Sequence, residues 1–190
     1  MVARRSLLAI LTMTALPSCS SSPNPTLYTI QPVTGAVRGS APRVIQLRPV
    51  GLARYLDRQQ IVRSAEGYRL DIATNDWWGE PLGTMLTRVL AEDLSQRLAG
   101  STVLNEDGAI TADPDLTVEI NIRRMDASRA GDIVLTAQFA INRRNPRRAL
   151  MTRAVDLSVP QVGADMNSFV AAASVAIGRL ADAITDGIRA

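Results

Sequence analysis

Three consecutive segments in the second half of the chain alternate strictly between apolar and polar residues, and this pattern constrains the fold more than any other. They are DLTVEINIRRM at 115–125, GDIVLTAQFAIN at 131–142 and RAVDLSVP at 153–160. Such alternation places every second side chain on one face of a strand, as in a half-buried sheet. In the first segment the apolar face comprises Leu116, Val118, Ile120 and Ile122. Because a Gly131-Asp132 turn and the short loop RRNPRR connect the segments, we expect three neighbouring antiparallel strands.

Two other stretches repeat apolar residues at helical spacing. The first follows Glu80, with Pro81 at the expected first helical position and Gly100 just past the expected end. The second runs from Asp165 to Ile188, and its charged residues Arg179, Asp182 and Asp186 argue against a membrane span. The sequence therefore predicts an α+β fold: a single domain with a mostly antiparallel sheet and two main helices packed on one face.

Shorter strands are expected nearer the start of the domain. The segments TLYTI and RVIQLRPV favour strands, and YRLDIAT alternates, with Tyr68, Leu70 and Ile72 expected on one face. Between them, Val50–Ser64 fits neither period, and its centre, Tyr55–Arg58, is expected to form a loop between strands.

The N-terminal segment has the three parts of an export signal. Arg4 and Arg5 precede an uncharged run from Leu7 to Leu16, which is too short to cross a bilayer, and small residues follow. The sequence Leu16-Pro17-Ser18-Cys19 resembles the bacterial lipobox, in which the cysteine thiol receives a lipid and cleavage makes that cysteine the first mature residue. We therefore expect residues 1–18 to be a lipoprotein signal peptide, 19–25 a lipidated tether and 26–190 the folded domain.

The residue after Cys19 bears on which membrane holds the anchor. Ser20 rather than aspartate follows the cysteine, which by resemblance to lipoprotein sorting signals favours the outer membrane, facing the periplasm. Anchoring in the inner membrane stays open as an alternative.

Composition excludes several classes of chemistry. The chain contains 21 basic residues, all arginine, and 18 acidic residues, with no histidine. Without histidine or lysine it has no Ser-His triad, imidazole metal ligand, Schiff-base lysine or P-loop lysine. Removal of the signal peptide takes away Arg4 and Arg5 and leaves 19 arginines against 18 acids, so nucleic-acid binding is not expected.

We accordingly expect no enzymatic activity, cofactor or metal site. The alternative, an acid-base hydrolase, would have to use carboxylates, and the candidates are Asp71, Asp76 and Glu80, which lie close in sequence. Loop solvation and helix capping explain these residues better, because no nucleophile or metal motif accompanies them.

Two motifs in order carry a resemblance to a known family. ARYLDRQQIVRS at 53–64 is followed by NDWWGEPLGTMLTRVLAEDL at 75–94, and together they resemble the PqiC-like ABC-type transport auxiliary lipoproteins. The opening YxL strand of that family appears here as Tyr28-Thr29-Ile30. The matching positions are Tyr55, Leu56, Asp57, Arg58, Gln60, Ile61, Val62, Trp78, Glu80, Pro81 and Leu82.

The resemblance implies a non-enzymatic component of an envelope transporter. Its partners would be an MCE-domain protein and the associated ABC permease and ATPase, and its role would be to help phospholipid or other hydrophobic cargo move between the two membranes. A structural or assembly lipoprotein of the outer membrane without a transporter partner is the alternative. Self-association into a homo-oligomer is left open.

Six residues are candidates for partner docking: Tyr55, Leu56, Asp57, Arg58, Trp77 and Trp78. Packing explains each of them equally well, since Tyr55 and Leu56 could close the edge of the core, Asp57 and Arg58 could form a surface pair, and one tryptophan could be a core anchor. A further cluster comprises Arg143, Arg144, Arg147 and Arg148. For this cluster a solvated hairpin tip around Asn145-Pro146 is favoured over a site for phospholipid headgroups.

Overall fold

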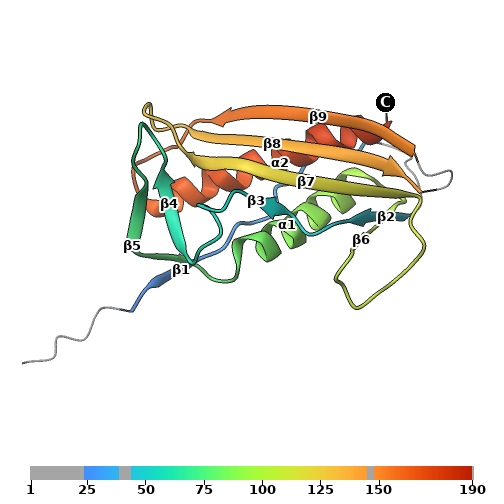
Figure 1. The fold of residues 1–190 in the computed structure, drawn as a ribbon, viewed down its shortest axis with the longest axis horizontal. Coiled ribbons are helices and arrows are strands. Elements are labelled where there is room, and N and C mark those ends of the chain that lie inside the picture. Colours follow the sequence, from blue (N-terminus) through green and yellow to red (C-terminus); the bar gives the residue numbers. More distant parts are fainter. Residues whose placement is uncertain (1–23, 39–43, 145–147, 190) are drawn as a thin grey trace, which may run out of the picture.

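The computed structural model describes residues 24–38, 44–144 and 148–189, which form one α+β domain with a mixed sheet of nine strands and two helices (Figure 1). The fold class expected from the sequence is confirmed. In chain order the elements are β1 (Thr26–Tyr28), β2 (Val44–Leu47), β3 (Gly51–Leu52), β4 (Gln60–Ser64), β5 (Asp71–Trp78), α1 (Leu82–Arg97), β6 (Thr102–Asn105), β7 (Leu116–Ala127), β8 (Ile133–Arg143), β9 (Arg148–Val159) and α2 (Met166–Arg189).

The strands β7, β8 and β9 form the long antiparallel part of the sheet, as the alternation predicted. β7 pairs with β8 from Leu116↔Arg143 to Ala127↔Ile133, and β8 pairs with β9 along its whole length. The predicted apolar face of β7 is buried, from Leu116 at 1% exposure to Ile122 at 0%. A register shift between Ile122 and Arg124 then changes the alternation, so that Met125 and Asp126 are both buried.

The two helices cover one face of this sheet (Figure 1). α1 begins directly after Pro81, and the chain turns away at Gly100, whose φ of +84° lies in the left-handed region that glycine adopts readily. α2 is capped by Asp165, whose Oδ1 accepts a hydrogen bond from the backbone N–H of Ser168 at 2.8 Å. α2 is long and apolar enough to pass a length and hydropathy test for a membrane span, but 67% of that window is buried within the domain.

The N-terminal half adds short strands that pair mainly in parallel. β2 lies between β6 and β7, and β1 pairs with β5 through Thr26↔Asp76 and Tyr28↔Trp78. The loop predicted at Tyr55–Arg58 is confirmed, and it lies between two short strands, β3 and β4, that the local pattern did not predict. β6 was not predicted.

The expected face of Tyr68, Leu70 and Ile72 is also wrong. A turn at Gly67, with φ +66°, precedes β5, which begins only at Asp71. Tyr68 is fully exposed and Leu70 is 44% exposed, while Ala73 carries the buried position. Hairpin geometry at the glycine therefore overrides the local alternation.

Candidate functional site

The first candidate surface is the turn at 53–59, which joins β3 to β4 and carries the ARYLDR motif. Hydrogen bonds from Leu56 N to Ala53 O and from Arg58 N to Leu56 O, both 2.9 Å, fix its shape. Leu56 is only 2% exposed and packs in the core, so it offers no free surface. Asp57 is exposed and Arg58 half-buried, and these two remain accessible.

Tyr55 holds this turn onto β7 through a buried carboxylate. Its hydroxyl donates a hydrogen bond to Asp126 Oδ2 at 2.9 Å. Burial is the largest cause that raises the pKa of the Tyr55 hydroxyl, and the hydrogen bond to Asp126 is the second. Asp126 Oδ1 accepts from Arg124 Nε at 3.0 Å, and Arg124 Nη2 reaches Glu66 Oε1 at 2.9 Å. The buried charge of Asp126 is thus paired and hydrogen-bonded.

The two tryptophans divide into one core residue and one half-buried residue. Trp78 is 6% exposed, and its backbone N–H donates to Gln59 O at 2.8 Å, so the structure brings the end of the WW motif against the 53–59 turn. Trp77 is half-buried, with its indole Nε1 donating to Thr74 O at 3.2 Å. Of the six docking candidates, Asp57 is exposed, Tyr55, Arg58 and Trp77 are half-buried, and Leu56 and Trp78 are buried.

Arg58 has one unusual feature. Its Nε is buried and makes no hydrogen bond within the described part of the chain. Buried side-chain donors normally have a hydrogen-bond acceptor, so this guanidinium nitrogen is an exception.

The carboxylates considered for acid-base chemistry do not come together as a set. Asp71 is paired with Arg63 at 2.7 Å, and Glu80 is paired with Arg88 at 2.7 Å near the start of α1. Asp71 and Asp76 both line a hollow of about 700 Å³ between the β4–β5 hairpin and the N-terminus of α2. Asp132 and Asp165 line it too, but Asp165 is occupied as the α2 cap, which lowers the pKa of its carboxyl.

The arginine cluster lies where β8 turns into β9. Arg143 is the register partner of Arg148, and these two arginines and Arg144 are exposed. Arg147 lies outside the described residues. The tip borders a polar hollow of about 680 Å³ on the sheet, which is also lined by Arg48 and Glu119.

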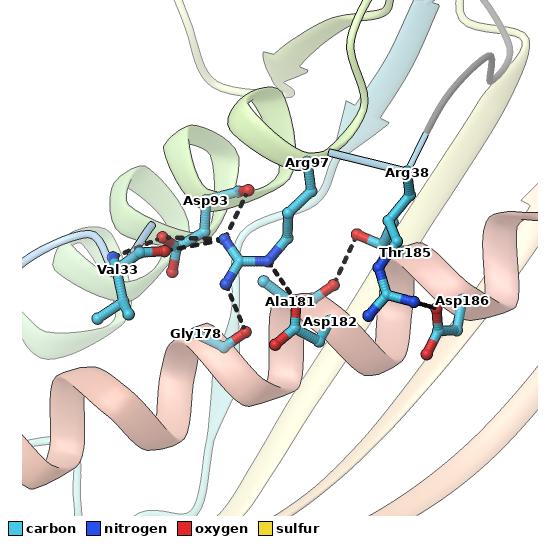
Figure 2. Close-up of polar contacts among 9 residues, drawn as sticks. All are labelled: Val33, Arg38, Asp93, Arg97, Gly178, Ala181, Asp182, Thr185 and Asp186. Carbon is cyan, nitrogen blue, oxygen red and sulfur yellow. Dashed lines mark hydrogen bonds and ion pairs between the residues drawn. The ribbon is translucent and has the colours of Figure 1, made fainter. Parts of the chain in front are cut away.

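A buried ion-pair cluster between the helices was missed from the sequence (Figure 2). Arg97 on α1 is 1% exposed, and its Nε donates to Asp182 Oδ1 on α2 at 2.8 Å. Its Nη1 lies 3.5 Å from Oδ1 of Asp93, which is fully buried, and its Nη2 donates to Gly178 O at 3.1 Å. Burial raises the pKa of Asp93. The available signal was an Asp and an Arg four residues apart on the apolar stripe of α1.

This cluster holds a segment that we call the N-terminal strap, residues 30–38, which runs between the helices without joining the sheet. Val33 N donates to Asp93 Oδ1 at 2.8 Å, and Val33 O accepts from Arg97 Nη1 at 3.0 Å. Further along, Arg38 N donates to Arg97 O at 2.8 Å, and Arg38 pairs with Asp186 at 2.9 Å (Figure 2). Side chains of the helices thus satisfy backbone groups that a sheet would otherwise satisfy.

Cys19, the proposed lipid attachment site, and the whole signal peptide lie outside the described residues. Their assignment stays a prediction from the sequence.

Comparison with known proteins gives a family and a fold. A family model described as "ABC-type transport auxiliary lipoprotein component" matches residues 26–185. None of the curated proteins compared with the chain matches it.

Among solved structures, a Xanthomonas campestris protein of family DUF330 is similar, with a TM-score of 0.69, 16% identity and coverage of 84% of this chain and 92% of that one. An uncharacterised protein has a TM-score of 0.71, 17% identity and coverage of 86% and 98%. A PelC dodecamer from Paraburkholderia phytofirmans has a TM-score of 0.50, 8% identity and coverage of 83% and 95%. At these identities the likenesses concern the fold alone.

Proposed function

This chain belongs to the family of ABC-type transport auxiliary lipoprotein components, and from that membership we propose a specific role for it. It is a lipid-anchored accessory subunit of an MCE/ABC-type envelope transporter, facing the periplasm from the outer membrane. It assists the movement of phospholipid or other hydrophobic cargo between the membranes by docking on the periplasmic MCE-domain component. The observation that carries this proposal is the family match over residues 26–185, nearly the whole folded domain.

The proposed role is binding, not catalysis. Histidine and lysine are absent from the sequence, and the carboxylates Asp71 and Glu80 are engaged by arginines. A lipid anchor and short tether would raise the concentration of the domain near a membrane-bound partner, which strengthens a modest contact.

The 53–59 turn is the proposed docking surface. Asp57 and Arg58 are accessible there, and the buried Arg58 Nε lacks an acceptor among the described residues. Arginine is among the residues that most often dominate interfaces, so the accessible part of the Arg58 side chain would contact the MCE-domain partner.

The test is co-purification of the Asp57→Ala/Arg58→Ala variant with the cognate MCE-domain protein. We expect affinity to fall by about thirtyfold or more, which corresponds to roughly 2 kcal/mol, because a central anchor is removed. Circular dichroism and yield should stay near wild type, since neither side chain makes an ion pair or hydrogen bond within the described part of the chain.

The matched control is Tyr55→Phe, which keeps the ring and removes the hydroxyl that binds Asp126. It should lower stability and leave partner binding unchanged when corrected for the folded fraction. A well-folded Asp57→Ala/Arg58→Ala variant that binds normally would exclude this turn as the docking surface. Absence of any MCE-domain partner for the wild type would instead favour the outer-membrane structural lipoprotein.

Self-association is a further part of the proposal. The likeness to a PelC dodecamer supports it at the level of fold. Sedimentation of the mature lipoprotein in detergent tests it, and a single species of monomer mass would contradict it.

A further inference from the structure

The end of the sheet where β8 turns into β9 places like charges directly against each other. Arg143 and Arg148 are register partners in an antiparallel pair, so their side chains leave the sheet on the same side. Like charges directly opposite each other destabilise a sheet. The pair also borders the polar hollow of about 680 Å³ described above.

Carboxylates of the protein do not neutralise this pair. All 18 acidic side chains lie within the described part of the chain, and none of them forms an ion pair with Arg143 or Arg148 there. The other two arginines of the hollow are occupied: Arg144 lies 3.7 Å from Asp113, and Arg48 lies 3.2 Å from Glu119 and 3.5 Å from Glu106. Four arginines line the hollow against two glutamates, Glu106 and Glu119, and a net positive charge remains even when Asp113 is counted beside Arg144.

The chemistry of the lining fits an oxyanion. Two guanidinium groups present planar forks of donors that match phosphate oxygens. We propose that the hollow binds a phosphate oxyanion, held by Arg143 and Arg148. This inference goes beyond the proposed docking function and does not depend on it, because the hollow and the 53–59 turn are separate surfaces.

The position of the hollow bears on the source of the phosphate. β1, where the chain leaves toward the tether, and the β8–β9 tip lie at opposite ends of the long axis of the domain (Figure 1). A domain anchored at one end therefore presents the arginine pair away from its own anchor, where it can meet the headgroup of a phospholipid or a soluble phosphate. These two sources share one chemistry and are separated by experiment.

The binding test uses the mature lipidated protein in a neutral detergent, titrated with inorganic phosphate and followed through backbone amide shifts. We expect saturable shifts at Thr117, Asn142 and Ala149, and an affinity about tenfold or more weaker in Arg143→Gln/Arg148→Gln, because two charge-assisted contacts are lost. The melting temperature of this variant should stay level or rise, since a like-charge pair is relieved.

The matched control is Arg69→Gln/Arg153→Gln, which removes the same charge from two exposed arginines that also make no ion pair in the described residues. It should bind phosphate as the wild type does. Unsaturable shifts in the wild type, or equal losses in the two variants, would overturn the proposal by reducing the effect to net charge.

A second experiment identifies the source. Protein anchored in phosphate-free galactolipid vesicles is mixed with galactolipid vesicles containing phosphatidylglycerol, and clustering is followed by light scattering. If Arg143→Gln/Arg148→Gln abolishes the clustering and the control variant preserves it, the site is supported and its ligand is a lipid headgroup. Saturable phosphate binding without clustering supports the site and assigns a soluble phosphate.

Discussion

Among single residues, Arg97 carries a charge that water does not reach. It is 1% exposed and is compensated by Asp93 and Asp182, while its remaining N–H groups donate to the carbonyls of Val33, Asp93 and Gly178. Such a cluster stabilises a fold only as a complete set, because each member left alone is a buried polar group without a partner.

Removing one member should therefore cost more than removing two. We expect Arg97→Met to lower the free energy of unfolding by about 3–5 kcal/mol, since Asp93 is left buried and unpaired. Arg97→Met combined with Asp93→Asn should recover part of that loss, because neither buried charge is left. Denaturant unfolding of the wild type, both single variants and the double variant measures the coupling. Strictly additive losses would contradict this account of the cluster.

The sequence predicted some site residues and missed others for identifiable reasons. The YLDR and WW motifs were found as motifs, but their burial was not, since only the tertiary structure places Leu56 and Trp78 in the core. Asp126 was missed because only the tertiary structure brings Tyr55 of the 53–59 turn against it, while the register shift after Ile122 puts Met125 on the apolar face of β7.

At the scale of elements, the N-terminal strap depends on close packing against α2. Gly178 lies where the strap crosses the helix, and a Cβ added there would meet Val33 Cβ at 3.0 Å. The strap therefore needs a glycine at this position for space rather than for backbone conformation.

Gly178→Ala should destabilise the domain, although alanine in a helix ordinarily gains about 0.5–1 kcal/mol over glycine. Overpacking of this kind typically costs about 1–3 kcal/mol, and here it pushes Val33 away from Asp93. Thermal unfolding should show a lower Tm, and hydrogen exchange should show faster exchange of the Val33 amide. The matched control is Gly83→Ala on α1, where the nearest atom, Val50 O, is 3.4 Å away. A stabilised Gly178→Ala variant would show that the strap tolerates displacement.

The elements that the sequence predicted are those whose pairing is local. Strands β7 to β9 follow one another and alternate over 11 or 12 residues each, so their pattern alone identified them. β6 and β3 are short, and they pair in parallel with strands distant in the chain. Such partners cannot be inferred from a few residues of local pattern, because only the long-range pairing makes these segments strands.

At the scale of the whole molecule, a single folded domain follows a short stretch that carries the lipidation signal. Residues 19–25 can extend to at most about 25 Å, so the lipid would hold the domain close to its membrane. The lipid anchor is predicted from the sequence around Cys19.

Cys19→Ser should abolish lipidation. The precursor should remain uncleaved by the lipoprotein peptidase or appear as a soluble periplasmic form, because the thiol that receives the lipid is gone. Mass spectrometry and membrane fractionation measure this directly. Ser20→Ala is the control and should leave lipidation intact. An unchanged mature mass and undiminished membrane association of Cys19→Ser would contradict the assignment.

The short length of β1 has a mechanical consequence. A force on the anchored end would reach the domain at Thr26, where only three residues, Thr26–Tyr28, pair with β5. Beyond them, Ile30 is fully buried and the strap is fastened to both helices through Asp93 and Arg97. Under a pulling force, β1 would detach from β5 first. Its three residues would then lengthen the tether by about 10 Å before the force reached the contacts between the strap and the helices. A lipid at Cys19 would therefore let the domain move about 10 Å further from its membrane before the force reached the strap.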